Sequence, residues 1–227
     1  MCTLSWSRLP STGLEIHFNR DELKTRSVAD PPALFESGDS SFLSPRDPKG
    51  GGTWMLVNDR GVVICLLNKW ELDGRTIDSP LSRGRLVWSM AETKSLDEVA
   101  DRLANLDRYQ AFTLAVFSPG GDSCWEWTGE ALTRGGVPEV LTSSSFRFDE
   151  VRKARLACFT SGLRGEDFHA SRHDPPSPYS VRMNRPDAQT WSRSRLRVGD
   201  QISWHYLAEQ ADLKGDPVET FVELPLQ

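Results

Sequence analysis

The chain begins with MCTLSWSRLP at residues 1–10 and continues with GLEIHFNRDE at residues 13–22. Residues 3–7 and 13–18 are strand-like, and the turn residues at 9–13 connect them, so the sequence predicts an N-terminal hairpin. A second hairpin is predicted where strands at 53–57 and 62–67 flank the turn Asn-Asp-Arg-Gly. Further strands are expected at 111–117, 124–127, 140–143, 180–184, 192–198 and 201–207.

Helical patterns are fewer than strand patterns. Residues 82–92 and 149–158 are typical of helices, and the capping box Ser95-Leu96-Asp97-Glu98 starts another. Residues 24–52 are rich in Ser, Pro, Asp and Gly, which predicts a long loop that helps to shape a ligand pocket. Many antiparallel strands with two or three helices indicate an α+β layered sandwich, formed as one domain over residues 1–227.

Composition excludes several classes of protein. The formal charge of −5 on 227 residues argues against general binding of nucleic acid or anionic membranes. We expect no signal peptide, because the first residues lack a basic n-region and an apolar h-region. We also expect no transmembrane segment, because the longest apolar run, at 62–67, is far too short to span a bilayer. The four cysteines show no paired spacing, which predicts reduced thiols in a soluble, cytoplasmic protein and gives no support for zinc.

Several motifs together are typical of one family. Asn19-Arg20-Asp21-Glu22 follows Met1-Cys2 at a characteristic distance, and Gly51-Gly52-Thr53-Trp54 precedes the turn at 58–61. With the segments 141–146 and 179–190, these motifs make the chain resemble the NRDE family, of the transport and Golgi organisation type, over nearly its whole length.

That family is similar to the N-terminal-nucleophile (Ntn) hydrolases of the bile-salt hydrolase, penicillin V acylase and acid ceramidase branch. The resemblance implies a four-layer αββα sandwich with two antiparallel sheets and an amidase-type site that needs no cofactor. Eukaryotic relatives are instead linked to haem or lipid handling. A non-enzymatic carrier or trafficking protein with a haem or acyl-lipid ligand is therefore the alternative.

Cys2 becomes chemically special if Met1 is removed, because one residue then carries a thiol and a free α-amine. The usual pKa values, about 8.5 for the thiol and about 7.7–8.0 for the amine, allow a neutral amine to take the thiol proton. Arg20 would favour the thiolate, and Asp21 would hold the amine by a hydrogen bond. The alternative for Arg20 and Asp21 is a surface ion pair.

An acyl-transfer site also needs donors for the developing oxyanion. The resemblance puts Asn68 in this role, although a turn-forming Asn after a strand is an equal alternative. Ser143 occupies the position where the hydrolases have a second Asn. Asn19, Trp54, Ser143 and Arg182 are the expected substrate-binding residues, for a small-molecule amide or acyl compound.

His169 and His173 have the spacing of metal ligands on a helix, but Pro175-Pro176 follow and favour a loop. In the haem-handling alternative, either histidine would serve as an axial ligand. The sequence therefore favours an N-terminal cysteine hydrolase that cleaves a linear amide through a thioester intermediate.

Overall fold

The computed structural model describes residues 2–9, 13–70 and 80–227, so the turn expected at 9–13 lies largely outside the described residues. The chain divides into two compact units. Unit 1 comprises Met1–Val28 and Glu139–Glu223, and unit 2 comprises Ala29–Pro138 and Leu224–Gln227. The prediction of one domain over 1–227 stays a prediction, and each unit is described by itself.

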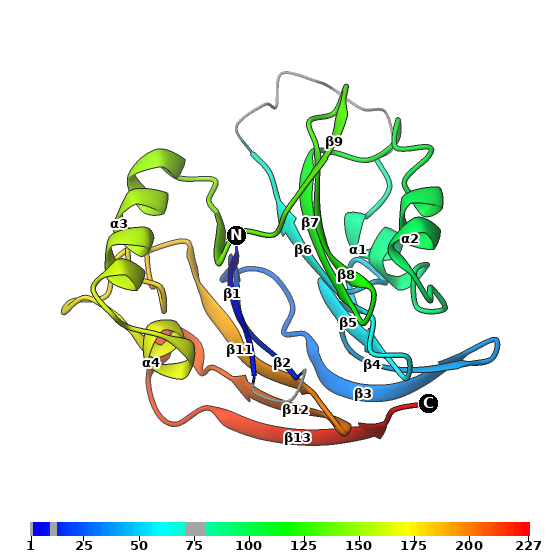
Figure 1. Ribbon diagram of the computed structural model, residues 1–227. Helices are drawn as coiled ribbons and strands as arrows, with labels where there is room; N and C mark the ends of the chain where they lie inside the picture. Colours follow the sequence, from blue (N-terminus) through cyan, green and yellow to red (C-terminus); the bar gives the residue numbers. More distant parts are fainter. Residues whose placement is uncertain (1, 10–12, 71–79) are drawn as a thin grey trace. The chain divides into compact units, whose positions relative to one another are not determined.

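Unit 1 is built on a six-stranded sheet with the strand order β10-β1-β2-β11-β12-β13 (Figure 1). Two helices, α3 and α4, pack on one face of this sheet and contact β10, β1 and β2. Its elements are β1 (Cys2–Arg8), β2 (Leu14–Leu23), β10 (Val140–Ser143), α3 (Phe148–Thr160), α4 (Gly165–Ala170), β11 (Ala188–Val198), β12 (Gln201–Ala208), the short 3₁₀ helix η2 (Ala211–Leu213) and β13 (Val218–Pro225).

The antiparallel register of unit 1 fixes which side chains share a face. Cys2 is paired with Ser143 on one side and with Arg20 on the other. Because alternate side chains point to opposite faces, Cys2, Leu4 and Phe18 lie on one face of the sheet, and Thr3 and Ser5 lie on the face that the helices cover. The hairpin predicted from the first residues is confirmed by the β1–β2 pairing.

Unit 2 contains a seven-stranded antiparallel sheet in which the strands follow one another in chain order, from β3 to β9. Helices α1 and α2 pack against β5, β6 and β8. The elements are β3 (Asp30–Ser37), β4 (Ser40–Arg46), β5 (Met55–Asn58), β6 (Val63–Asn68), α1 (Arg83–Trp88), α2 (Leu96–Arg102), β7 (Phe112–Ser118), β8 (Gly121–Trp127) and β9 (Leu132–Gly135).

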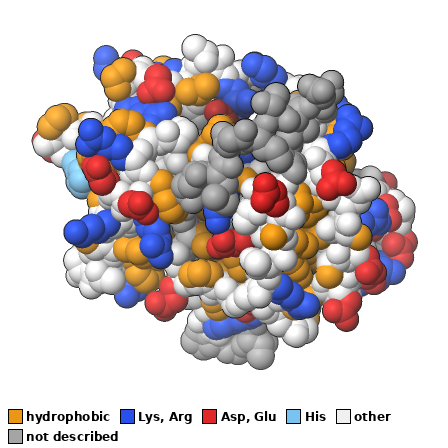
Figure 2. Space-filling model, turned by 90° about the horizontal axis from the view of Figure 1, so that it is seen from above, with side chains coloured by type: hydrophobic (Ala, Val, Ile, Leu, Met, Phe, Trp, Pro, Cys, Tyr) orange, Lys and Arg blue, Asp and Glu red, His pale blue; other side chains and the backbone are white. Residues whose placement is uncertain are grey.

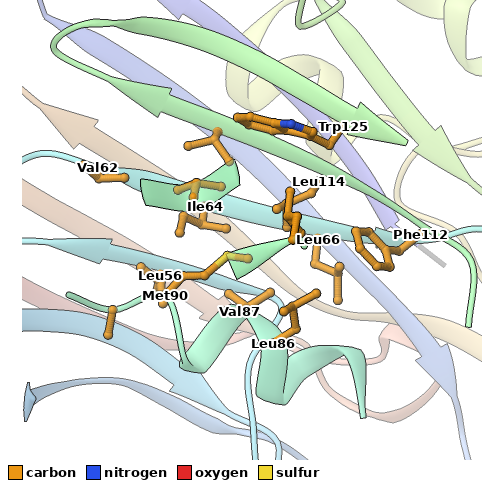
Figure 3. Close-up of a cluster of buried hydrophobic side chains, with 14 of the residues drawn as sticks. Leu56, Val62, Ile64, Leu66, Leu86, Val87, Met90, Phe112, Leu114 and Trp125 are labelled. Carbon is orange, nitrogen blue, oxygen red and sulfur yellow. The ribbon is translucent and has the colours of Figure 1, made fainter. Parts of the chain in front are cut away.

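The core of unit 2 lies between its sheet and its helices (Figure 3). Ile64 and Leu66 project from β6 toward Leu86 and Val87 of α1, and all four side chains are buried. The predicted capping box forms in part: Ser95 accepts a hydrogen bond from the Glu98 amide at 3.2 Å, which helps to fix the start of α2. These contacts explain why the hairpin at 53–67 and the helix after Ser95 were predicted correctly.

Two sequence predictions about secondary structure are wrong, and a third is wrong in part. Residues 24–52 are not a long loop, because β3 and β4 lie within them, paired as a hairpin. Residues 180–184 form an isolated bridge at Asn184 and no strand. His169 lies in helix α4, whereas His173 lies in the loop that the prolines predict. The missed strand β3 begins Asp-Pro-Pro, and such prolines are tolerated here because β3 is an edge strand with a bulge.

The two antiparallel sheets, each with its own helical layer, confirm the α+β fold class. On the face seen in Figure 2, Lys and Arg side chains are interspersed with Asp and Glu side chains outside the grey residues, as suits a small net charge. Among residues 2–9, 13–70 and 80–227, no helix is long and apolar enough to cross a membrane.

Candidate active site

Cys2 is the first residue of β1, and only 6% of its surface is exposed. Its side chain lies on the sheet face opposite to α3 and α4, in one cross-strand row with Arg20. Arg20 is also buried, and its guanidinium is 3.9 Å from the Glu22 carboxylate, two residues along the same face. The structure thus brings the cysteine and one predicted partner together.

The backbone nitrogen of Cys2 has a defined hydrogen-bond partner. It donates to Ser143 Oγ at 2.9 Å, across the β1–β10 pair. The carbonyl oxygen of Cys2 accepts a bond of 3.2 Å from Thr142 Oγ1. Both polar groups of the Cys2 backbone are therefore held by hydroxyl side chains of β10.

Burial raises the pKa of the Cys2 thiol to about 11, and the charges of Asp21 and Glu22 act in the same direction. The positive charges of the chain terminus and of Arg20 lower the pKa and oppose this shift. With the chain intact at Met1, the thiol is therefore protonated at neutral pH. A nearby base is needed before Cys2 can act as a nucleophile.

Asp21 lies on the other face of β2, toward the helices. Its Oδ2 accepts from Arg155 of α3 at 3.1 Å, and its Oδ1 accepts from Thr190 of β11 at 2.7 Å. Asp21 and Arg155 are both buried. The role of Asp21 at the α-amine stays a prediction, and the Cys2 nitrogen donates a hydrogen bond to Ser143 Oγ.

Asn19 also faces the helices. Its amide donates to the carbonyl oxygens of His169 at 2.9 Å and Val181 at 3.0 Å, and its Oδ1 is hydrogen-bonded to His169 Nδ1 at 2.8 Å. His169 Nε2 is bonded to Ser5 Oγ at 2.9 Å, so both ring nitrogens are occupied. Asn19 thus anchors α4 to the sheet, and His169 has no ring nitrogen free for a metal or haem iron.

Arg182 belongs to a separate buried ion-pair group. Glu209, whose side chain is completely buried, accepts from Arg182 Nη2 at 2.5 Å and from Arg193 Nε at 2.7 Å. Arg193 lies in the same row as Asn19, on the helix-covered face. This arrangement gives Arg182 a structural contact on the side of the sheet away from the Cys2 thiol.

The same helix-covered face carries a small open pocket beneath α4. Its lining includes Arg193, Arg195 and Glu166, and Arg195 is 3.6 Å from Glu166. The ring of His17, which also lines the pocket, is 3.1 Å from the Glu15 carboxylate. Burial lowers the pKa of His17, and it lowers the pKa of His169 well below the usual value. The pocket lies on the opposite face of the sheet from Cys2, so it is distinct from the row that contains the thiol.

Two candidates, Trp54 and Asn68, belong to unit 2. Trp54 is buried just before β5, and its carbonyl accepts from the Leu66 amide at 2.8 Å. Asn68 ends β6, is half-buried, and is paired with Phe112 of β7. In the strand pattern Asn68 shares a face with Ile64 and Leu66, whose side chains pack toward α1.

Within residues 2–9, 13–70 and 80–227, no group of three or more His, Cys, Asp or Glu side chains is arranged to hold a metal ion. His173, the second histidine of the predicted pair, is exposed, and its Nδ1 is hydrogen-bonded to Ser177 Oγ at 3.0 Å.

Arg155 is the residue that sequence reasoning missed. It lies on α3 between Val151 and Phe159, four residues from each, and all three side chains are buried. A charged residue on the apolar stripe of a helix is a signal of a buried partner, because an unpaired charge is costly to bury. That signal was present in the sequence, but it does not identify Asp21 as the partner.

Comparison with solved structures defines the class of fold. The chain is similar to a cysteine-to-alanine mutant of the conjugated bile acid hydrolase from Clostridium perfringens, with a TM-score of 0.56 and 14% identity over 99% of this chain and 92% of that one. It is also similar to the Caenorhabditis elegans orthologue of N-acylethanolamine-hydrolyzing acid amidase, with a TM-score of 0.62 and 9% identity over 86% of this chain and 92% of that one. The fold is that of the Ntn hydrolases.

The family follows from the sequence itself. The profile of the Transport and Golgi organisation 2 family matches residues 1–154, about two thirds of the chain, and the chain belongs to that family. A comparison with curated proteins gives no match. The family resemblance expected from the NRDE motif is therefore confirmed.

Proposed function

We propose that this protein is an N-terminal cysteine hydrolase that cleaves a linear, non-peptide amide of a small molecule. The observation that carries the proposal is the position of Cys2. Its backbone nitrogen donates a hydrogen bond to Ser143 Oγ at 2.9 Å, and Cys2 is paired with Arg20 on the neighbouring strand β2. Removal of Met1 would turn that nitrogen into an α-amine that is already hydrogen-bonded.

The chemistry begins with proton transfer within one residue. The neutral amine of Cys2 takes the thiol proton, directly or through a water molecule, and the thiolate attacks the amide carbonyl carbon. The tetrahedral intermediate collapses by breaking the C–N bond, and the amine passes the proton to the leaving nitrogen. Water then attacks the resulting thioester, which releases the carboxylic acid and restores the thiol.

Two residues of unit 1 support these steps. Ser143 accepts an N–H of the amine, which leaves the nitrogen lone pair available for the thiol proton. Arg20 lowers the pKa of the thiol through its positive charge. In this proposal Ser143 takes the amine-holding role that the sequence assigned to Asp21. Asn68 remains the sequence-based candidate for the oxyanion donor, and Trp54 remains a candidate substrate contact.

The substrate class is proposed from the fold. Both solved structures named above are hydrolases, one of conjugated bile acids and one of N-acylethanolamines. In both substrates an acyl group is joined to a small amine through an amide. We therefore expect this chain to accept an N-acyl amide with a small polar amine portion.

The first experiment measures the intact mass of protein purified without an N-terminal tag. A mass one methionine residue lower than the encoded chain is expected. The processed protein is then incubated with N-acyl aminomethylcoumarin compounds of increasing acyl length, and fluorophore release is recorded. Mass spectrometry of the quenched reaction should show an acyl adduct on Cys2 that hydroxylamine removes, as a thioester requires.

Cys2→Ala should abolish release of the fluorophore while ligand binding persists, and Cys158→Ala is the matched control for a thiol outside the site. Asn68→Ala tests the oxyanion assignment and should lower the rate by about 10²–10³-fold if Asn68 is a donor. Met1 retained in folded protein would contradict the proposal. Binding of haem or acyl lipid that Cys2→Ala leaves unchanged, without turnover, would indicate a carrier.

A further inference from the structure

Arg155 contacts three strands at once from beneath the sheet. Its Nη1 donates to Thr3 Oγ1 of β1 and, at 3.0 Å, to Thr142 Oγ1 of β10. Its Nη2 donates to Asp21 Oδ2 of β2 at 3.1 Å and to the Pro178 carbonyl at 3.5 Å. A single buried guanidinium therefore joins β10, β1 and β2.

The three acceptor residues have a particular place in the sequence. Thr3 directly follows Cys2, Thr142 directly precedes Ser143, and Asp21 directly follows Arg20. Neighbouring residues of a strand point to opposite faces, so Arg155 contacts the neighbours on one face while the candidate site lies on the other. We propose that Arg155 is a positioning residue, which keeps the three strands in the register that joins Cys2 to Ser143 and Arg20.

This inference rests on the proposed function and deepens it. In the proposed mechanism, the hydrogen bond from the Cys2 amine to Ser143 holds the nitrogen with its lone pair free for the thiol proton. Small shifts between strands would change this geometry, because the hydrogen bond and the Cys2–Arg20 pairing both depend on register. Two further hydrogen bonds link β1 and β10. Thr3 Oγ1 and Thr142 Oγ1 are hydrogen-bonded at 3.2 Å, and Thr142 Oγ1 donates to the Cys2 carbonyl oxygen.

The chemistry of arginine suits this task better than that of lysine. A guanidinium presents several N–H donors in one rigid plane, and here two of its nitrogens serve acceptors on three strands. A lysine ammonium in the same place would keep the charge but would not reach all three acceptors in that plane. Arg155→Lys therefore removes the geometry while it keeps the ion pair with Asp21.

The test uses the full chain with Met1 removed, as verified by mass. Iodoacetamide alkylates the protein at a series of pH values, and the rate at Cys2 is followed by peptide mass spectrometry. The readout is the pH of half-maximal alkylation of Cys2. The variants are Arg155→Lys and Thr142→Val, with exposed positions Arg152→Lys and Thr133→Val as matched controls. Thr142→Ser restores the hydroxyl and should restore the wild-type profile.

We expect Arg155→Lys and Thr142→Val to raise the half-maximal pH by about one unit, which is about a tenfold lower rate at pH 7.5. The matched controls should keep the wild-type value. If Arg155→Lys does not fold, Thr3→Val decides, because it removes an acceptor of Arg155 but keeps the Thr142–Cys2 hydrogen bond and the Arg155–Asp21 ion pair, and it should raise the half-maximal pH in the same way.

Two contrary results are distinguishable. Folded variants with an unchanged half-maximal pH would overturn the role of Arg155 and leave the hydrolase proposal standing. The second contrary result compares the processed wild-type chain with a chain that carries an uncleaved extension ahead of Met1. If Cys2 has the same alkylation profile in both chains, the hydrolase proposal is overturned. This result would overturn the positioning role as well, since no activation would then exist.

Discussion

The Asp21 carboxylate and the Arg155 guanidinium are 3.1 Å apart, and their side chains are 0% and 1% exposed. This ion pair joins β2, which carries the family motif, to helix α3. Breaking a buried pair on one side leaves an uncompensated charge, whereas replacing both partners with apolar groups is often tolerated. Removing one charge of this pair should therefore cost more stability than replacing both residues with apolar ones.

Asp21→Asn should lower the free energy of unfolding by about 3–5 kcal/mol, because Arg155 loses its counter-charge in a buried place. Urea denaturation followed by circular dichroism measures the effect. The double variant Asp21→Leu/Arg155→Met should lose less free energy of unfolding than Asp21→Leu and Arg155→Met lose in sum, since neither charge is then left unpaired. Strict additivity would show that the pair is not coupled.

Arg20 should control the acidity of Cys2. Its charge lowers the pKa of the thiol against the effect of burial, so Arg20→Leu should raise that pKa and slow alkylation of Cys2 at any fixed pH below it. Arg20→Lys should retain most of the wild-type rate because the charge is kept. Arg8→Leu, at the exposed end of β1, is the control, and the measurement is the iodoacetamide profile. Equal rates in Arg20→Leu and wild type would contradict the assignment.

Stability should decrease in mild acid because of His169. Burial holds its pKa well below 6.5 in the folded protein, while the unfolded chain takes up a proton near pH 6.5. The unfolded state therefore binds more protons as the pH falls below 6.5, and the free energy of unfolding declines. The stability contributed by neutral His169 is present above pH 6.5 and is lost progressively below it.

The measurement compares urea midpoints at pH 7.5 and pH 5. His169→Gln keeps a side chain capable of hydrogen bonding to Asn19 and Ser5 but does not titrate, so the loss between the two pH values should shrink. The exposed His173→Gln should leave the loss unchanged. A loss of the same size in His169→Gln and wild type would assign the acid sensitivity to other groups, His17 among them.

The glycines of the motif at 51–54 have a packing role. A Cβ added to Gly52 would lie 2.2 Å from the carbonyl carbon of Gly84, and the Thr53 amide donates to the Gly84 carbonyl at 3.1 Å. Gly52→Ala should therefore destabilise the protein by at least about 1–3 kcal/mol, as overpacking does. Gly136→Ala, where a Cβ meets no atom within 4 Å, is the control in thermal unfolding. Equal midpoints for the two variants would show that the backbone relaxes freely.

The fold class could be predicted because its local signals agree with the final structure. Alternation and turn residues indicated the hairpins at 3–18 and 53–67, and the Ser95 capping box indicated α2. The strands β3, β4, β9 and β13 were missed. β3 has prolines at its second and third positions, and β13 is largely exposed, so neither has the apolar pattern of a buried strand.

The candidate site could be predicted only in part. The hairpin and the spacing of Cys2 and Arg20 indicated their neighbourhood, and period-2 alternation places Asn19 and Asp21 on the opposite face from Arg20. The partners of those two side chains, His169 and Arg155, are more than 130 positions away in the chain. No local pattern specifies which helix covers which strands.

By itself, the sequence indicated the residue types and the first hairpin: a cysteine directly after Met1, an arginine shortly after the second strand, and strands with one apolar face. These are local properties, since alternation and turn chemistry act over a few residues. The register that pairs Cys2 with Arg20 came from the structure. The tertiary structure alone decided that Ser143 meets the Cys2 nitrogen and that Arg155 joins the three strands. Those contacts depend on pairing between segments far apart in the chain, which forms only when the helices and sheet bury their apolar faces together.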